Sequence, residues 1–113
     1  AEKLDIEAMR AAARELTGTH DFRAFCSLKR YKKSTVRSIY SLEIEEKGPE
    51  IRLIVRGDGF LYNMVRILAG TLIEVGLGER KPEEMQKILA SRDRQQAGHT
   101  APPQGLILQE VWY

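Results

Sequence analysis

The sequence of 113 residues contains a single cysteine, Cys26. One cysteine excludes a disulfide within the chain, and it cannot form a metal site by itself. Sparse cysteine is typical of proteins in a reducing compartment, so we expect a cytoplasmic setting. The residue type favours a small, semi-buried hydrophobic role for Cys26.

Long hydrophobic runs are also missing. No stretch approaches the roughly 20 apolar residues of a membrane-spanning helix, which argues against a membrane partner. The first residues show no signal-peptide pattern, and there is no repeat or low-complexity tract. Hydrophobic residues make up 42% and charged residues 30% of the chain, as in ordinary globular proteins. We therefore expect a single domain over residues 1–113 with one modest core.

The formal net charge is only +2, which is too small to indicate a nucleic-acid partner by itself. The cations are unevenly distributed, however. Residues 23–37 contain six basic side chains and no acid, and these form the basic cluster: Arg23, Lys29, Arg30, Lys32, Lys33 and Arg37. Such a cluster produces a local positive field suited to phosphate groups. The alternative is an ordinary solvated loop, and Tyr31 within it is either a base-stacking residue or a half-buried tyrosine.

The most apolar segment follows a turn at residues 57–59 and predicts a long helix. Asp58 is the expected N-cap, because its carboxylate can accept hydrogen bonds from first-turn amides. Gly76 is the expected left-handed residue just past the helix end. Apolar residues recur at helical spacing and predict that most of this helix is core: Leu61, Met64, Val65, Leu68, Leu72 and Val75.

One polar stripe interrupts this apolar helix, and it consists of Asn63, Arg66, Gly70 and Glu74. The guanidinium of Arg66 is costly to bury unless an anion faces it, because arginine keeps its charge in proteins. Small residues one turn away, Ala69 and Gly70, should leave open space around it. Arg66 either forms a structural ion pair with Glu74 or a distant acid, is simply exposed, or serves a functional site.

Periodicity elsewhere predicts the remaining elements. We expect a helix over residues 4–16 that is capped by Asp5, a short helical turn over 19–22, and two antiparallel strands over 34–46 and 51–56. A helix over 82–91 that starts at Pro82, an irregular connection over 92–103 and a closing strand over 106–113 should follow. In the first long strand, Val36, Tyr40 and Leu42 should share the core face, with Ile39 as an exception. The order predicts an α+β fold with an antiparallel sheet and helices packed on one face.

Three segments, in order, resemble the tRNA pseudouridine synthase A family. They are Gly-Thr-His-Asp-Phe-Arg-Ala-Phe at residues 18–25, Gly-Phe-Leu-Tyr-Asn-Met-Val-Arg at 59–66, and Ala-Gly-His-Thr-Ala-Pro-Pro-Gln-Gly-Leu-Ile-Leu at 97–108, with Val-Trp-Tyr at 111–113. The resemblance covers nearly the whole chain. Several motifs in the correct order are more specific evidence of a family than any one motif alone.

The resemblance implies an enzyme that isomerises uridines in the tRNA anticodon arm to pseudouridine, without metal or organic cofactor, and acts as a homodimer. It also implies a catalytic aspartate in a Gly-Arg-Thr-Asp-type motif. That motif does not occur in this sequence, so the chain resembles the C-terminal half of the family's fold and is expected to be inactive alone.

The resemblance implies two site residues. Arg66 matches the arginine that pairs with the catalytic aspartate, and Leu106 matches the apolar residue that packs against the target base. A core position in a strand explains Leu106 equally well. Asp58 as the nucleophile is an alternative, although a cap or turn role explains it without further assumption.

Two further questions stay open from the residues. His20 beside Asp21 suggests either acid–base chemistry or, as we favour, local hydrogen bonds. For the whole chain, the rival interpretations are a non-catalytic RNA-binding module and a structural or dimerisation domain with the same fold. An upstream Gly-Arg-Thr-Asp segment in the gene would discriminate among them.

Overall fold

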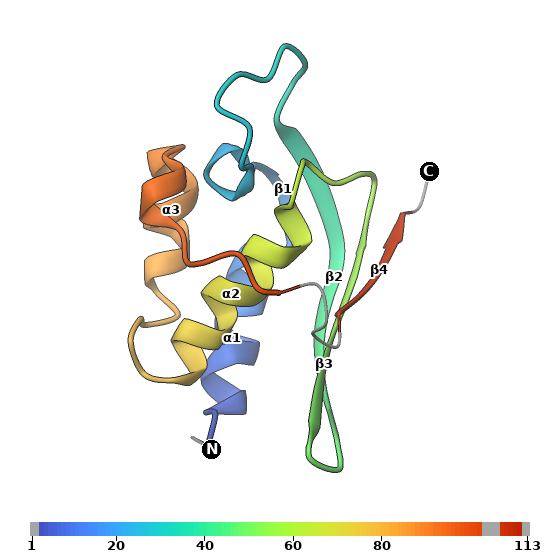
Figure 1. The fold of residues 1–113 in the computed structure, drawn as a ribbon, viewed down its shortest axis with the longest axis vertical. Coiled ribbons are helices and arrows are strands. Elements are labelled where there is room, and N and C mark those ends of the chain that lie inside the picture. The colour runs from blue at the N-terminus through green and yellow to red at the C-terminus, as the bar shows by residue number, and fades with distance from the viewer. Residues whose placement is uncertain (1–2, 103–106, 112–113) are drawn as a thin grey trace.

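The computed structural model describes residues 3–102 and 107–111. In these residues, a sheet with the order β1-β2-β3-β4 is covered on one face by helices (Figure 1). The strands are β1 (Gly18–Asp21), β2 (Val36–Lys47), β3 (Glu50–Gly57) and β4 (Ile107–Val111). The first three run antiparallel, and β4 pairs with β3 in parallel. The predicted α+β class, with an antiparallel sheet and helices on one face, is confirmed, and the parallel edge strand is an addition to it.

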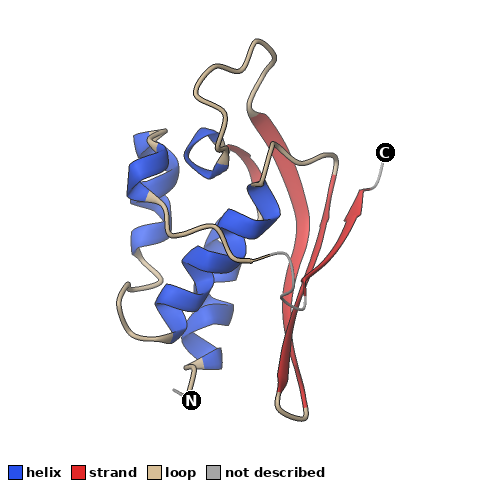
Figure 2. Ribbon diagram, in the orientation of Figure 1, coloured by secondary structure: helices blue, strands red, loops and turns tan. Residues whose placement is uncertain are grey.

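The helices are α1 (Ile6–Leu16), α2 (Met64–Gly76) and α3 (Glu84–Ser91), and Figure 2 shows them together on one side of the strands. The N-cap predicted for α1 is confirmed, because the Asp5 carboxylate accepts a hydrogen bond from the Ala8 amide at 3.0 Å. The Asp5 amide also donates to the carbonyl of Gly76 at 2.9 Å, which ties the start of α1 to the end of α2.

The hydrophobic core lies between the helices and the sheet. Its largest fully buried side chains come from every layer, and they include Leu16, Phe22, Phe25, Ile39, Val55, Ile67, Leu68, Leu72 and Met85. Burying a leucine or phenylalanine side chain contributes about 2 kcal/mol. Because its apolar side chains pack in this core, α2 holds its polar stripe in a fixed position.

The face predicted for part of β2 is wrong because the strand contains a β-bulge. Ile39 pairs with Gly57 and Ser41 with Arg56, so Tyr40 is an extra residue without a partner on β3. An extra residue exchanges the two faces of the strand. Accordingly, Ile39 is buried in the core, while Tyr40 and Val36 are 58% and 46% exposed.

The short helical turn predicted over residues 19–22 is also wrong. Residues 19–21 belong to β1, which pairs with the start of β2, and Phe22 precedes a 3₁₀ turn, η1 (Arg23–Phe25). The Asp21 carboxylate accepts hydrogen bonds from the Arg23 amide and from Thr35 Oγ1, at 3.1 and 2.6 Å. His20 Nε2 lies 2.7 Å from the Thr17 carbonyl. His20 therefore makes the local contact expected of it. Asp21 makes one local contact, to the Arg23 amide, and two distant ones, to Thr35 and to Arg92, whose Nε lies 3.5 Å from Asp21 Oδ2.

The two ends predicted for the central helix need correction. Helix α2 begins at Met64, and Asp58 is not its N-cap, because its carboxylate accepts a hydrogen bond from the Ser38 amide of β2 at 2.9 Å. At the other end, Gly76 is the last helical residue, and Gly78 takes the left-handed conformation with φ +81°. The Glu79 amide then bonds to the Glu74 carbonyl, as in a Schellman motif.

Candidate functional site

The connection after α3 crosses the polar stripe of α2. Residues 97–101, called the strap, lie so close to the helix that a Cβ at Gly70 would be 1.8 Å from the His99 carbonyl oxygen. A Cβ at Gly98 would be 2.7 Å from the Thr71 Cα. Only glycine fits at these two positions. The open space predicted beside Arg66 is therefore occupied by backbone at Gly70, which corrects that expectation.

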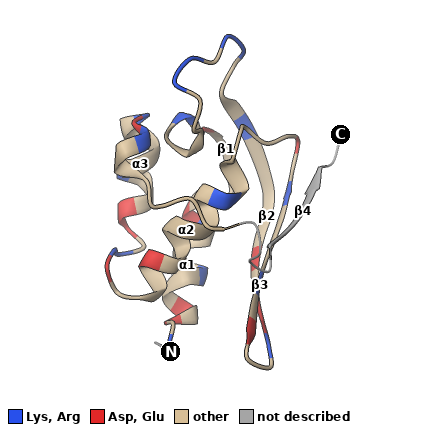
Figure 3. Ribbon diagram, viewed as in Figure 1, with Lys and Arg blue, Asp and Glu red and all other residues tan. Residues whose placement is uncertain are grey.

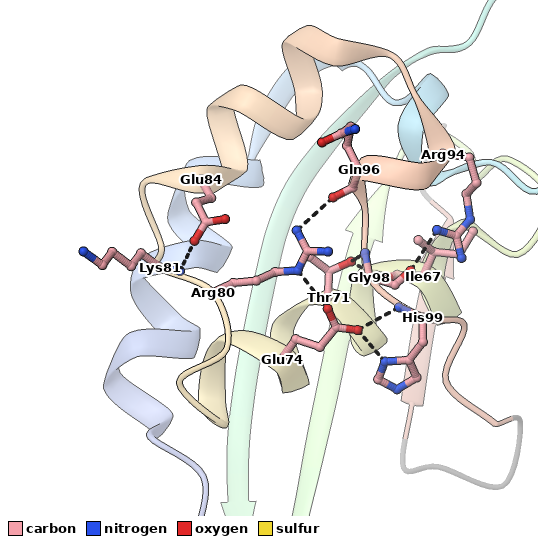
Figure 4. Close-up of polar contacts among 10 residues, drawn as sticks. All are labelled: Ile67, Thr71, Glu74, Arg80, Lys81, Glu84, Arg94, Gln96, Gly98 and His99. Atoms are coloured by element: carbon pink, nitrogen blue, oxygen red, sulfur yellow. Dashed lines mark hydrogen bonds and ion pairs between the residues drawn. The ribbon is translucent and has the colours of Figure 1, made fainter.

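Polar contacts fasten the strap along α2, as Figure 4 shows. The buried Thr71 hydroxyl accepts a hydrogen bond from the Gly98 amide at 2.9 Å and donates to the Ile67 carbonyl at 2.7 Å. One turn later, Glu74 Oε2 accepts from the His99 amide at 2.9 Å and lies 2.7 Å from His99 Nδ1. The strap is thus held by buried and charge-assisted bonds, which are stronger than ordinary surface contacts.

Glu74 is the electrostatic centre of this network. Its other carboxylate oxygen accepts from Arg80 Nε at 2.8 Å, and Arg80 Nη1 donates to the Gln96 carbonyl (Figure 4). Burial by itself would raise the pKa of the Glu74 carboxyl, but hydrogen bonds from His99 and Arg80 outweigh burial and lower the pKa from 4.5 to about 2. The Glu74 carboxylate therefore stays ionised and holds the strap over a wide pH range.

This depressed pKa predicts a pH-dependent stability. Because the folded pKa of Glu74 lies below the unfolded value of 4.5, the carboxylate contributes stability above that pH and loses it as the pH falls toward about 2. We expect Glu74→Gln to lower the urea midpoint at neutral pH, and the gap to wild type to close progressively between pH 4.5 and about 2.

The matched control is Glu83→Gln, because Glu83 is exposed and its side chain does not cap α3. This variant should follow the wild-type urea midpoint at every pH. A Glu74→Gln deficit that stayed constant down to about pH 2 would contradict the assignment of the low pKa to this carboxylate.

Arg66 lies in the same stripe, half-buried, and its contacts are neutral. Nε donates to the Ala101 carbonyl at 2.7 Å, and Nη1 donates to Asn63 Oδ1 at 3.2 Å. The Arg66 carbonyl also accepts from the Ala101 amide at 3.0 Å. Glu74 is not its partner, because that carboxylate pairs with Arg80 and His99. No acid within the described ranges forms an ion pair with Arg66, so its charge remains available to an anion.

The basic cluster divides into two groups. Lys29, Arg30, Lys32 and Lys33 are exposed on the loop between η1 and β2, whereas Arg23 and Arg37 are half-buried. Arg37 Nη1 donates to the carbonyls of Ser34 and Val36 at 2.7 Å, and Arg23 donates to the Lys29 carbonyl. Figure 3 shows cations along this loop at one end of the molecule and acids toward the β2–β3 turn at the other.

The other candidate residues differ in their exposure and contacts. Cys26 has the hydrophobic role expected of it but is fully rather than partly buried, at 2% exposure. Tyr31 is half-buried, and its hydroxyl accepts from Arg37 Nη2 at 3.4 Å. Leu106 lies outside the described residues. In the described ranges, no group of three His, Cys, Asp or Glu side chains could hold a metal ion, and no helix has the length and hydropathy to cross a membrane.

Sequence reasoning singled out the polar stripe but missed what contacts it. The strap and the Asn63 contact with Arg66 were not predicted. The available signals were the glycines at 70 and 98, which suit close backbone approach, and the asparagine three residues before Arg66.

Comparison with known proteins identifies the family. Residues 12–113 match the family model described as tRNA pseudouridine synthase. The chain is 54% identical over 110 residues to tRNA pseudouridine synthase A of Brevibacillus brevis, and the alignment covers 97% of the chain and 45% of that relative. The corresponding enzymes of Geobacter sp. and Bacillus subtilis are 51% and 46% identical, again over 98% of this chain and 45% of their own length. The chain, which spans under half the length of these relatives, belongs to the tRNA pseudouridine synthase family.

Proposed function

We propose that this chain is the C-terminal half of a tRNA pseudouridine synthase, which isomerises uridines in the tRNA anticodon arm to pseudouridine. The observation that carries the proposal is Arg66, a half-buried cation with two neutral oxygen partners and no ion pair to an acid of the described chain. Support also comes from the family and from the 45% share of the relatives' length that the chain spans.

The reaction needs an ionised nucleophile rather than a metal. The glycosidic bond between N1 of the base and C1′ of the ribose breaks, the base turns, and a bond from C5 to C1′ forms. C5 then loses its proton and N1 gains one, so the atoms balance without a cofactor. A carboxylate that attacks the nucleoside must be unprotonated, and the bond that it forms must break again when C5 bonds to C1′, which regenerates it. A guanidinium beside this carboxylate lowers its pKa and fixes its orientation.

Arg66 is suited to this role. Among the described residues, Ala101 and Asn63 use only Nε and one N–H of Nη1, which leaves N–H groups on Nη1 and Nη2 for a carboxylate fork. The nucleophile itself would be the aspartate of a Gly-Arg-Thr-Asp-type segment, and this sequence contains none. In this proposal Leu106 packs against the target base, and the complete enzyme is a cytoplasmic homodimer that holds tRNA.

The proposal predicts that activity requires both halves. The gene should encode a Gly-Arg-Thr-Asp segment upstream of Ala1, and the complete protein should release tritium from tRNA labelled at C5 of uracil, because C5 loses its hydrogen in the reaction. The chain of residues 1–113 alone, checked by circular dichroism for folding, should release none. Tritium release by this chain above a no-protein control would contradict the proposal, as would an upstream sequence without the segment.

The exposed part of the basic cluster is expected to contact tRNA phosphates. In the complete enzyme, Lys32→Glu with Lys33→Glu should weaken tRNA binding. The negative slope of log affinity against log salt should become shallower by about 1.5, because each lost phosphate contact removes about 0.7 to 0.9 from its magnitude. Binding titrations at several salt concentrations measure both quantities.

A matched control makes the same change in net charge away from the loop. Lys47 and Lys81 are exposed and lie at the end of β2 and before α3, so reversing both charges should leave the salt slope near wild type. An unchanged slope in the Lys32/Lys33 variant would show that these side chains do not contact phosphate.

A further inference from the structure

Asn63 has an unusual backbone conformation for its position. It precedes α2 with φ 60° and ψ 11°, in the left-handed region, whereas residues at helix N-caps are normally extended. Among the described non-glycine residues, only Arg92 shares a positive φ, and it lies after α3, where left-handed residues are common. Strained backbone at a helix start persists only where the surrounding contacts determine it.

Those contacts come from the side chain. Asn63 makes no side-chain bond to the amides of its own helix, although asparagine is a favoured cap. Instead Oδ1 accepts from Arg66 Nη1 at 3.2 Å, and Nδ2 donates to Ser27 Oγ at 3.1 Å. The orientation of the amide follows from the chemistry, because a guanidinium can only donate and so must face the oxygen.

Ser27 lies at the start of the loop that carries the exposed part of the basic cluster. Its amide donates to the Tyr62 carbonyl at 3.3 Å, so two hydrogen bonds fasten this end of the loop to residues 62–63. Asn63 therefore forms side-chain hydrogen bonds with both the loop, at Ser27, and Arg66.

We propose that Asn63 is a positioning residue for Arg66 and links its orientation to the base of the basic loop. The proposal rests on the function proposed above. Ala101 fixes the Nε side of the guanidinium and Asn63 fixes Nη1, and two contacts define the plane of a rigid fork. The guanidinium then directs its remaining N–H groups toward the nucleophile in a fixed orientation. When phosphate binds to the loop and moves Ser27, Asn63 transmits this movement to the side chain of Arg66.

The test uses four variants of the complete enzyme: two at Asn63, a control at Arg92, and Arg66→Ala as the reference. Asn63→Gly keeps the left-handed backbone but removes both side-chain bonds, and kcat should fall about 10- to 100-fold with the KM for tRNA within about twofold, because misplacement near the reacting atoms costs rate. Asn63→Asp also tolerates this backbone, yet it places a carboxylate against Arg66 that competes with the nucleophile. It should be as stable as wild type and still slow. Arg92→Gly is the matched control at the other left-handed position, with kcat unchanged.

Each outcome decides the proposal. A lower kcat in both Asn63 variants, with the thermal midpoint and KM preserved and Arg92→Gly normal, supports it. Near-wild-type kcat for Asn63→Gly or Asn63→Asp overturns it, and so does a loss of kcat that only accompanies a lower melting temperature. If Arg66→Ala is inactive while Asn63→Gly is normal, only the role of Asn63 fails. If Arg66→Ala retains normal turnover, the proposed function fails as well.

Discussion

Arg66→Ala in the complete enzyme is expected to lower kcat at least about 100-fold, because a nucleophile that loses its orienting partner moves away from the reactive geometry. The KM for tRNA should stay within about twofold, since one internal cation is a small part of an interface dominated by phosphate contacts. Arg66→Lys keeps the charge but loses the planar fork, so it should restore little of the rate. Single-turnover tritium release and tRNA binding measure the two effects separately.

The domain should stay folded in these variants. Arg66 makes two hydrogen bonds to neutral oxygens and no ion pair with an acid of the described residues, so truncation costs about 1 kcal/mol for each bond and leaves no buried carboxylate unpaired. Arg14→Ala is the matched control, because Arg14 is exposed on α1. Unfolding of Arg66→Ala, or turnover close to that of Arg14→Ala, would assign Arg66 a structural role and exclude the proposed one.

The sequence predicted the elements whose signals are local. The apolar periodicity of α2, the cap of α1 at Asp5 and the existence of the β2–β3 hairpin each depend on residues a few positions apart, and all are found in the structure. Such signals are read from one segment without knowledge of its neighbours. The closing strand is likewise found, as β4 over residues 107–111.

The errors occur where a distant segment decides the local structure. Asp58 is a good cap by type, but the amide of Ser38, 20 residues earlier, engages its carboxylate instead. Tyr40 faces away from the core because a bulge, which its own sequence does not mark, shifts the register against Arg56. Tertiary contacts override local preference in both cases.

For the candidate site, the sequence likewise predicted the residues of the polar stripe but not their distant partners. The stripe of α2 was found because one cation on an apolar helix is physically costly and therefore conspicuous. Its contacts were not, because the strap reaches Arg66 and Glu74 from 25 to 35 residues away. Charge alone suggested Glu74 as the partner of Arg66. Geometry pairs Glu74 with Arg80 and His99 and leaves Arg66 to carbonyl and amide oxygens.

The strap makes Gly70 the position where the smallest substitution should have the largest structural effect. A Cβ there would lie 1.8 Å from the His99 carbonyl oxygen and 2.7 Å from its carbon, and both atoms are backbone. The strap must move away, which breaks the bonds from Gly98 to Thr71 and from His99 to Glu74. Each contributes about 1 kcal/mol or more, and overpacking adds about 1–3 kcal/mol, against a gain of about 1 kcal/mol in helix propensity.

We therefore expect Gly70→Ala to lower the free energy of unfolding by about 3 kcal/mol, measured by urea denaturation, and to speed hydrogen exchange at the Gly98 amide. Gly76→Ala is the matched control in the same helix. The three atoms nearest to its Cβ would be side-chain atoms of Met9 and Leu4, which can shift, so its stability should stay within about 1 kcal/mol of wild type. Because Ala101 belongs to the strap and bonds to Arg66, Gly70→Ala should also reduce turnover of the complete enzyme, whereas Gly76→Ala should not. Equal stabilities for the two variants, with slow exchange retained at Gly98, would mean that the strap does not lie against Gly70 in solution.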